Sequence, residues 1–257
     1  MNNTLEQREL GTTGISVSTL GLGTVKFGRN QGVKYPKSFS LPDDKTLLRL
    51  LAAAADFGIN LLDTAPAYGQ SETRLGSLIK KTRNNWIVVT KVGEEFEQGV
   101  SSYDFSKQHT RYSVERSLKR LQTDYLDCVL VHSDGNDKDI ISRGEVLPTL
   151  LELKACGLIR SIGFSGKDAA ETAMAIPEVD VIMATLNLTD KSQLPLIDQC
   201  RLANKGVLIK KALASGHAPD TSSALAYVLG TQGVTSAIVG TINQAHLKNN
   251  VSALTND

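Results

Sequence analysis

Four polar side chains of different chemistry follow short apolar segments in the first half of the chain. Asp63 ends the run LLD, Lys91 ends VVTK and His132 ends VLVH, while Tyr68 follows Asp63 within the run DTAPAY. A tyrosine has a pKa of about 10 in water, so its phenol can donate a proton at neutral pH, and a neighbouring lysine held by a carboxylate would lower that pKa. A histidine can orient a carbonyl oxygen. This combination suits the reduction of a carbonyl group.

Each of these residues also has a common structural role. A carboxylate at the end of a strand often caps a helix or binds a loop, an isolated lysine is usually solvated, and a tyrosine or histidine often packs in the core. Any one of them alone would be a weak indication of function. Because all four follow apolar segments of the same kind, we interpret them together as one site.

Short apolar segments alternate with longer segments of helical periodicity along the chain. This order predicts parallel strands joined by crossover helices. The predicted strands lie near 18–23, 60–63, 86–91, 126–131, 159–163, 180–184, 206–210 and 236–239. The predicted helices lie near 44–57, 71–81, 107–121, 145–155, 168–175, 192–203, 220–229 and 243–250. Since functional side chains of an α/β barrel lie at the C-terminal ends of its strands, the four polar residues would share one rim.

Residues with typical capping roles support several of these boundaries. Ser71 and Asp168 are typical of helix N-caps. Gly58, Gly157 and Gly206 stand where helices should end. The agreement between capping residues and periodicity favours the count of eight strand and helix pairs.

The chain length and the N-terminal segment complete the predicted fold. With 257 residues, the chain suits a single domain, 1–257, with the (β/α)8 TIM-barrel fold of the α/β class. The segment 8–17 has Gly-Thr-Thr-Gly between apolar residues, which predicts a short N-terminal β-hairpin closing the bottom of the barrel. A doubly wound sheet would need a glycine-rich turn running into a helix, but Gly21, Gly23 and Gly28 lead into a long loop.

Composition excludes several classes of partner. A formal net charge of +1 predicts no nucleic-acid or anionic membrane binding. The N-terminus lacks the plan of a secretory signal, and no apolar run approaches the roughly 18 residues of a membrane span, so we expect a cytoplasmic protein. The thiols Cys128, Cys156 and Cys200 are widely spaced and are expected to be reduced. Four scattered histidines form no metal-ligand pair, so we expect no metal site.

Several runs together resemble successive signatures of the aldo-keto reductase family. LLDTAPAYGQSE, VVTK and VLVH are the specific ones, and GLGT and SIGFSG add weaker matches, in order over residues 8 to 250. The resemblance implies that Asp63, Tyr68, Lys91 and His132 form the catalytic tetrad, with Tyr68 as general acid. It also implies an NAD(P)H-dependent oxidoreductase that reduces small aldehydes or ketones, or oxidises the alcohols, with its nicotinamide cofactor bound across the barrel mouth.

The resemblance also assigns cofactor contacts, from the nicotinamide end to the adenosine end. Gly23 and Thr24 match the turn near the nicotinamide ribose, and Ser165 matches the serine that contacts the carboxamide. Leu213 and Ser215 match the loop that covers the pyrophosphate. The full set of expected cofactor-binding residues is Gly23, Thr24, Asp63, Ser165, Lys210, Lys211, Leu213, Ser215, Gly240, Thr241, Asn243, His246 and Asn250. A helix N-terminus near Asn243 would favour phosphate there.

Some positions depart from the pattern of the family around the nicotinamide. Gly166 stands where Asn is usual and Met183 where Gln is usual, so two amide groups that would contact the carboxamide are lost. Lys210 replaces an aromatic residue that stacks on the nicotinamide, and Lys211 replaces a serine. Both lysines could be solvated or could contact phosphate or substrate.

The adenosine segment departs from the pattern as well. Asn249 stands where Glu often binds the adenine, and His246 stands where a basic residue usually binds the 2′-phosphate. The remaining candidate partners of a 2′-phosphate are Thr241, Asn243, His246 and Lys248, of which Lys248 alone carries a dependable charge. The habit of the family favours NADP (NADPH) over NAD.

The substrate pocket should be walled by the loop 25–39 and by the segment after His132. The wall would include Lys26, Phe27, Tyr35 and Phe39. We expect an open, polar site for a small-molecule carbonyl substrate such as an aldehyde or a sugar. Oligomeric state is left open between a monomer and a weak oligomer.

Two other functions remain possible on the sequence. One is a nicotinamide-nucleotide-binding regulatory barrel with little turnover, because the carboxamide contacts are missing. The other is a Schiff-base lyase or isomerase that uses Lys91 or Lys210 as nucleophile.

Overall fold

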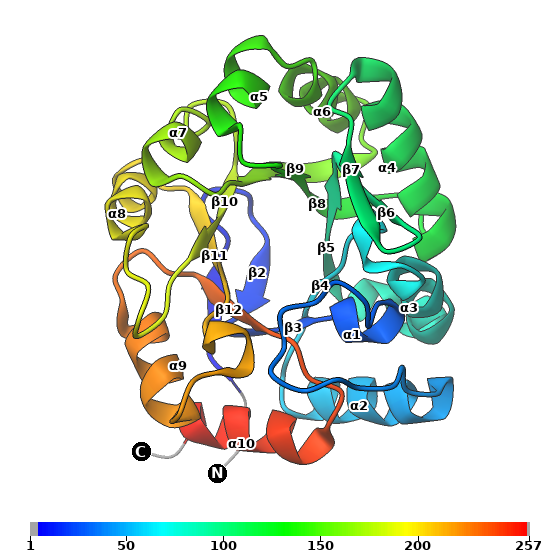
Figure 1. Cartoon of the computed structure of the whole chain (residues 1–257), viewed down its shortest axis with the longest axis vertical. Coiled ribbons are helices and arrows are strands. Elements are labelled where there is room, and N and C mark those ends of the chain that lie inside the picture. Colours follow the sequence, from blue (N-terminus) through cyan, green and yellow to red (C-terminus); the bar gives the residue numbers. More distant parts are fainter. Residues whose placement is uncertain (1–4, 256–257) are drawn as a thin grey trace.

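The computed structural model describes residues 5–255, and a closed barrel of parallel strands forms its centre (Figure 1). The strands follow one another around the ring in the order β10-β11-β12-β3-β4-β5-β8-β9. Their bounds are Leu20–Gly23 (β3), Leu61–Asp63 (β4), Ile87–Val92 (β5), Leu126–His132 (β8), Ile159–Ser165 (β9), Val181–Thr185 (β10), Gly206–Lys210 (β11) and Ser236–Val239 (β12). The predicted (β/α)8 fold is confirmed, and each predicted strand lies within about two residues of the observed one.

Helices surround the ring of strands and bury their apolar faces against it (Figure 1). The helices that follow the barrel strands are α2 (Asp44–Asp56), α3 (Ser71–Ile79), α4 (Lys107–Leu121), α6 (Val146–Ala155), α7 (Ala169–Ala173), α8 (Leu194–Leu202), α9 (Thr221–Gly230) and α10 (Gln244–Thr255). Shorter helical segments were not predicted: α1 (Val25–Gly28), α5 (Asp137–Arg143) and the 3-10 turns η1 (Pro66–Tyr68), η2 (Lys80–Asn85) and η3 (Ala214–Gly216). Within residues 5–255, no helix combines the length and the apolar character that crossing a bilayer requires.

The N-terminal hairpin closes the bottom of the barrel, as predicted. Strands β1 (Gln7–Glu9) and β2 (Ser16–Ser18) pair antiparallel. Leu10 and Ile15 from this hairpin are at most 2% exposed and pack in one cluster with the inward-facing Val89, Leu130 and Leu208 of the barrel strands. The hairpin thus excludes water from one end of the barrel, so the opposite end is the one available for a site.

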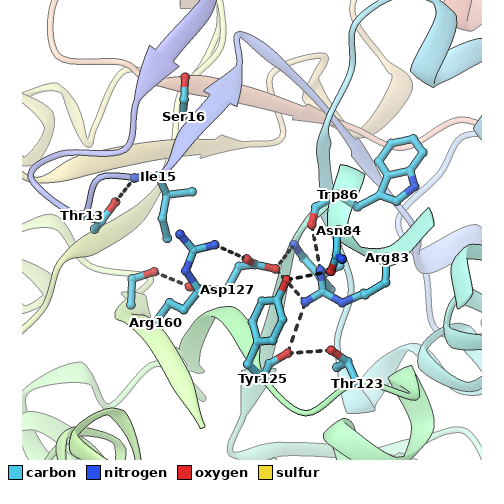
Figure 2. Close-up of polar contacts among 12 residues, drawn as sticks. Thr13, Ile15, Ser16, Arg83, Asn84, Trp86, Thr123, Tyr125, Asp127 and Arg160 are labelled. Carbon is cyan, nitrogen blue, oxygen red and sulfur yellow. Dashed lines mark hydrogen bonds and ion pairs between the residues drawn. The ribbon is translucent and has the colours of Figure 1, made fainter. Parts of the chain in front are cut away.

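A buried carboxylate joins three neighbouring segments near the bottom of the barrel (Figure 2). Asp127, on β8, accepts hydrogen bonds from Arg83 at 2.7 Å, from Arg160 at 2.9 Å and from the Val88 amide at 3.0 Å. Arg83 also donates to the Trp86 carbonyl at 2.8 Å. Because Asp127 and Arg83 are almost fully buried, each charge depends on the other for compensation.

Two of the predicted capping residues have other roles. Asp168 accepts a hydrogen bond from the Glu171 amide, so its prediction as an N-cap is confirmed. Ser71 is instead the first residue of α3, and its hydroxyl donates to the Thr24 carbonyl in the buried interior. Gly206 does not end a helix either: it begins β11, where a Cβ would lie 2.6 Å from a methyl carbon of Leu10. The close approach of the N-terminal hairpin explains this glycine.

Candidate active site

The four predicted catalytic residues meet at the open rim of the barrel. Asp63 and His132 are the last residues of β4 and β8, Lys91 is the second-last residue of β5, and Tyr68 ends η1. The Lys91 ammonium lies 2.5 Å from Asp63 Oδ1 and 4.9 Å from the centre of the Tyr68 ring. The rings of Tyr68 and His132 are 6.4 Å apart, centre to centre, and nearly perpendicular. All four line one cavity.

Lys91 is held as a buried ammonium. Its side chain is 2% exposed, and it donates to Asp63 Oδ1 and, at 2.9 Å, to the Thr64 carbonyl. Such an ion pair is unfavourable to break, because the remaining charge would be buried without a partner. A protonated amine is not a nucleophile. Lys91 is therefore suited to supply a fixed positive charge and not to form a Schiff base.

The expected lowering of the Tyr68 pKa is wrong for this structure. Burial raises the pKa of Tyr68 well above 10, and the nearby Asp63 carboxylate raises it further. Because Asp63 also pairs with Lys91, the negative charge offsets the effect of the cation on the phenol. Tyr68 consequently remains protonated throughout the neutral range, as a proton donor must before it reacts.

His132 has a carboxylate neighbour that the sequence analysis missed. Its Nδ1 lies 2.8 Å from Glu94 Oε2, although the oxygen lies off the direction of an aligned Nδ1–H bond, so the contact is mainly electrostatic. Burial lowers the pKa of His132, while Glu94 opposes this effect and the cations Lys91 and Lys210 add to it. The protonation of His132 thus reflects the balance between one carboxylate and two lysines.

Glu94 is itself held as a carboxylate by several neighbours. Burial opposes its ionisation, but His132, the Ser101 hydroxyl and Arg29 outweigh burial and lower the pKa of Glu94 to about 2. Ser101 donates to Glu94 Oε1 at 2.6 Å, and the Arg29 guanidinium lies 3.9 Å from the same oxygen. The negative charge beside His132 is therefore present throughout the neutral range.

Glu94 begins a β-hairpin that follows the third strand of the barrel. Strands β6 (Glu94–Glu97) and β7 (Val100–Tyr103) pair antiparallel, and Gln98 and Gly99 between them both have positive φ angles. A two-residue turn with positive φ at both positions is a typical hairpin connection, and glycine favours it. The Gln-Gly pair was the signal in the sequence for this hairpin. The contact of Glu94 with His132 has no such local signal.

The cavity has a volume of about 770 Å³, within the range of roughly 300–1,000 Å³ of small-molecule and cofactor sites. Most of the predicted cofactor-binding residues line it together with the tetrad: Gly23, Asp63, Ser165, Lys210, Lys211, Leu213, Ser215, Gly240, Thr241, His246 and Asn250. Met183, Lys26 and Tyr35 line it too. The catalytic and cofactor predictions therefore refer to one continuous space.

Comparisons with known proteins agree with this arrangement. The model of the Aldo/keto reductase family matches residues 19–223. The chain belongs to the aldo-keto reductase family. It is 29% identical to the L-galactose dehydrogenase of Arabidopsis thaliana, with 98% of this chain and 88% of the relative covered. It is 31% identical to the NADH-specific methylglyoxal reductase of Escherichia coli, with 78% of this chain and 64% of the relative covered.

A solved structure is similar over nearly the whole chain. An aldo-keto reductase homologue from Pseudomonas aeruginosa is 50% identical, with a TM-score of 0.91 and 98% of this chain and 96% of that chain covered. This aldo-keto reductase is therefore an NAD(P)-dependent oxidoreductase that acts on carbonyl compounds or the corresponding alcohols. Nothing in the comparisons favours a regulatory barrel without turnover.

Two of the predicted cofactor residues do not line the cavity of this aldo-keto reductase. Thr24 is fully buried, and its hydroxyl donates to the Asp63 carbonyl at 2.9 Å, so it supports the backbone of a catalytic residue. Asn243 accepts hydrogen bonds from the amides of Ala245 and His246 at the start of α10. Asn243 thus satisfies amides that we had expected to bind phosphate.

The turn after β11 carries free donors that fit a phosphate. Ala214, Ser215 and Gly216 all have positive φ angles. Within the described part of the chain, the amides of Leu213 and Ser215 have no hydrogen-bond acceptor, and both residues line the cavity. Non-glycine residues with positive φ often occur at functional sites, and converging amides bind anions. These two amides could therefore hold the pyrophosphate of a nicotinamide dinucleotide.

The replacement of the family's asparagine by Gly166 has a packing explanation. A Cβ on Gly166 would lie 2.5 Å from Asp137 Oδ2 and closer still to the Thr172 hydroxyl, so no larger residue fits. The Asp137 oxygen accepts from the Lys167 amide at 2.7 Å and from Thr172 at 2.8 Å. Asp137 lies on the unpredicted helix α5, so the sequence offered no local sign of this contact.

The loop 25–39 forms one wall of the cavity, but two of the residues expected in that wall do not line it. Tyr35 and Lys26 line the cavity, and the Lys26 ammonium lies 3.8 Å from the centre of the Tyr35 ring. Phe39 packs edge-on against Tyr35 at 5.7 Å. Phe27 is fully buried in the core and does not face the cavity, because it packs where α1 meets the barrel. The expectation for Phe27 was therefore wrong, and so was the one for Phe39, which packs on Tyr35 without lining the cavity.

We expect Glu94→Gln to shift the protonation of His132. Without the carboxylate, the imidazolium loses its stabilising neighbour, so the pKa of His132 should fall further below its ordinary value. NMR titration of the His132 ring protons measures this shift. Because the ring also loses a contact that orients it, kcat/KM should fall by up to about 10²-fold.

Glu95→Gln on the same hairpin is the matched control. Glu95 pairs with Arg116 and lies 3.3 Å from His109, away from the tetrad. The Glu95→Gln variant should leave the pKa of His132 unchanged. An unchanged His132 pKa in Glu94→Gln would refute the electrostatic role of Glu94.

Proposed function

We propose that Tyr68 donates the proton to the carbonyl oxygen during reduction, while the bound cofactor supplies the hydride. The observation that carries this proposal is a protonated, partly buried phenol that lines the cavity beside the Lys91–Asp63 ion pair. As the carbonyl oxygen gains negative charge, the Tyr68 hydroxyl transfers its proton to it. The Lys91 ammonium then stabilises the phenolate that remains, and Asp63 keeps Lys91 in place.

His132 has a positioning role in this proposal. It lies across from the Tyr68 ring and lines the same cavity, so both can contact one carbonyl oxygen. Glu94 holds the ring by its charge, and the hairpin β6–β7 brings Glu94 to this place. In the oxidation of an alcohol the same groups act in reverse, with Tyr68 as the proton acceptor.

For the cofactor, we propose NADPH over NADH. Cationic side chains outnumber acidic ones around the cavity. The acidic lining residues are Asp63 and Glu94, and the cationic ones are Lys26, Arg29, Lys34, Lys37, Lys91, Lys167, Lys210 and Lys211. This excess of positive charge favours the cofactor with the additional phosphate. His246 and Thr241 line the cavity and could contact that phosphate. Lys248 does not line it.

The substrate that we propose is a small, polar aldehyde or sugar. The wall around Tyr68 offers Lys26, Arg29, Ser133 and Lys167 as polar or charged contacts. Two relatives have names that fit this class, a methylglyoxal reductase and an L-galactose dehydrogenase. Strong activity on bulky apolar ketones, with none on small aldehydes, would contradict the proposal.

Titration with both cofactors tests the proposed function. We expect quenching of protein fluorescence by NADPH and by NADH, with tighter binding of NADPH, and oxidation of bound NADPH on mixing with methylglyoxal or an aldose. Tighter binding of NADH would contradict the NADPH preference but not the reaction. Binding without oxidation across a panel of small aldehydes and sugars would contradict the proposed activity.

A further inference from the structure

Lys210 places a second ammonium at the catalytic end of the cavity. It is the last residue of β11 and lines the cavity together with Tyr68, Lys91 and His132. Its Nζ donates to Ser165 Oγ at 3.0 Å and to the Gly166 carbonyl at 2.7 Å. Among residues 5–255, no carboxylate lies within 4.0 Å of this nitrogen. Both acceptors are thus neutral, and the charge of Lys210 is not compensated by an ion pair.

Two positions beside Lys210, 166 and 183, carry no amide side chain that could pair with a carboxamide. Gly166 has no side chain and has no room for one. Met183 is 3% exposed and packs with the inward-facing apolar residues of the barrel. Lys210 donates to the Ser165 hydroxyl and to the Gly166 carbonyl, and it therefore lies beside the positions that lack an amide side chain. An ammonium has three N–H donors, so one remains after these two contacts.

The surroundings of Lys210 are positively charged. Burial, and to a smaller extent the cations Lys211, Lys91 and Lys167, lower its pKa to about 7, although Asp137 partly opposes them. Oδ2 of Asp137 accepts hydrogen bonds from the Lys167 amide and the Thr172 hydroxyl, and its Oδ1 accepts one from the Ser133 hydroxyl. Lys210 is therefore partly charged at neutral pH, and its charge would respond to any new charge placed beside it.

A nicotinamide ring changes its own charge when it reacts. The oxidised ring carries one positive charge and the reduced ring carries none. A ring that exchanges hydride with a carbonyl held by Tyr68 must lie at the end of the cavity that Lys210 shares with Tyr68. A cation there repels the oxidised ring and not the reduced one, and the repulsion is strong where water is excluded.

We propose that Lys210 contacts the carboxamide of the nicotinamide and that its positive charge makes this aldo-keto reductase bind reduced cofactor more tightly than oxidised cofactor. The inference rests on the proposed function, since it requires a nicotinamide nucleotide in the cavity. The positive charge of Lys210 gives the enzyme a bias toward carbonyl reduction at neutral and acidic pH. The bias disappears when Lys210 loses its proton.

The test compares the dissociation constants of NADP⁺ and NADPH by calorimetry for the wild type and Lys210→Met. At pH 6, we expect the wild type to bind NADP⁺ at least about tenfold more weakly than NADPH. Lys210→Met should reduce this ratio about tenfold, and Lys210→Arg, which keeps the charge, should restore it. Raising the pH of the wild type to 9 should reduce the ratio as Lys210→Met does.

Proton release provides a readout independent of turnover. The oxidised ring should lower the pKa of Lys210, so NADP⁺ binding near pH 7 should release part of a proton in the wild type and none from this site in Lys210→Met. Lys205→Met is the matched control, because Lys205 precedes the same strand at its opposite end. It should leave the ratio unchanged.

The outcomes separate this inference from the proposed function. If both redox forms bind and Lys210→Met leaves their ratio unchanged at pH 6, the role of Lys210 is refuted while the reductase activity stands. If the folded wild type binds no nicotinamide nucleotide at all, the proposed function fails, and the inference fails with it.

Discussion

Tyr68→Phe should lose about 10²–10⁴-fold in kcat, the usual contribution of general acid catalysis, while its affinity for NADPH stays close to that of the wild type. The substitution removes the hydroxyl and keeps the ring that packs beside Lys91 and His132. The phenol is protonated at neutral pH, so the substitution removes the proton that the proposed transfer requires. Steady-state kinetics on a small aldehyde and a fluorescence titration with NADPH measure the two quantities.

Tyr112→Phe is the matched control for this variant. Tyr112 is 56% exposed on α4 and lies outside the cavity. It should have the kcat of the wild type. A Tyr68→Phe enzyme with the kcat of the wild type would refute Tyr68 as the proton donor, whereas a loss of NADPH binding would show that the hydroxyl serves the cofactor instead.

Asp127→Ala should lower the free energy of unfolding by about 3–5 kcal/mol, the range for removing one partner of a buried ion pair. Arg83 would remain buried with its charge uncompensated, and the Val88 amide would lose its acceptor. Figure 2 shows that Asp127 lies between Arg83 and Arg160, which come from separate segments of the chain. Urea denaturation at pH 7, followed by circular dichroism, measures the change.

Two further variants keep this prediction testable. Asp127→Asn retains the shape and one acceptor, so it should fold and lose less stability than the alanine variant. Asp198→Ala removes an exposed carboxylate that pairs with Arg201 within one helix, and it should cost at most about 1 kcal/mol. An Asp127→Ala protein within that same margin of the wild type would refute the role assigned to the buried pair.

The order of strands and helices could be predicted because each is encoded locally. Apolar runs bounded by turns predict buried strands, and periodic segments between them predict helices. Once the barrel is predicted, Asp63, Lys91 and His132 must lie on one rim, because they end parallel strands. The hairpin at 94–103 was not predicted, because it interrupts the regular alternation of strands and helices. The Gln-Gly turn was a local signal for it.

The roles of several residues at the site could not be predicted in this way. Ser71 has the sequence context of a cap, but its hydroxyl meets Thr24, which lies far away in the sequence. Gly206 follows a helix, but the N-terminal hairpin determines its role. Such contacts depend on how the closed barrel brings distant segments together, and no local pattern encodes them.

The sequence by itself determined the family, the barrel and the identity of the four residues at its rim. The tertiary structure decided how those residues are charged. Burial and the nearby Asp63 carboxylate, which also pairs with Lys91, keep the Tyr68 phenol protonated. Glu94 approaches His132 from a hairpin that was not predicted from the sequence. A pKa depends on burial and on charges within a few ångströms, and those distances are set only when the chain has folded.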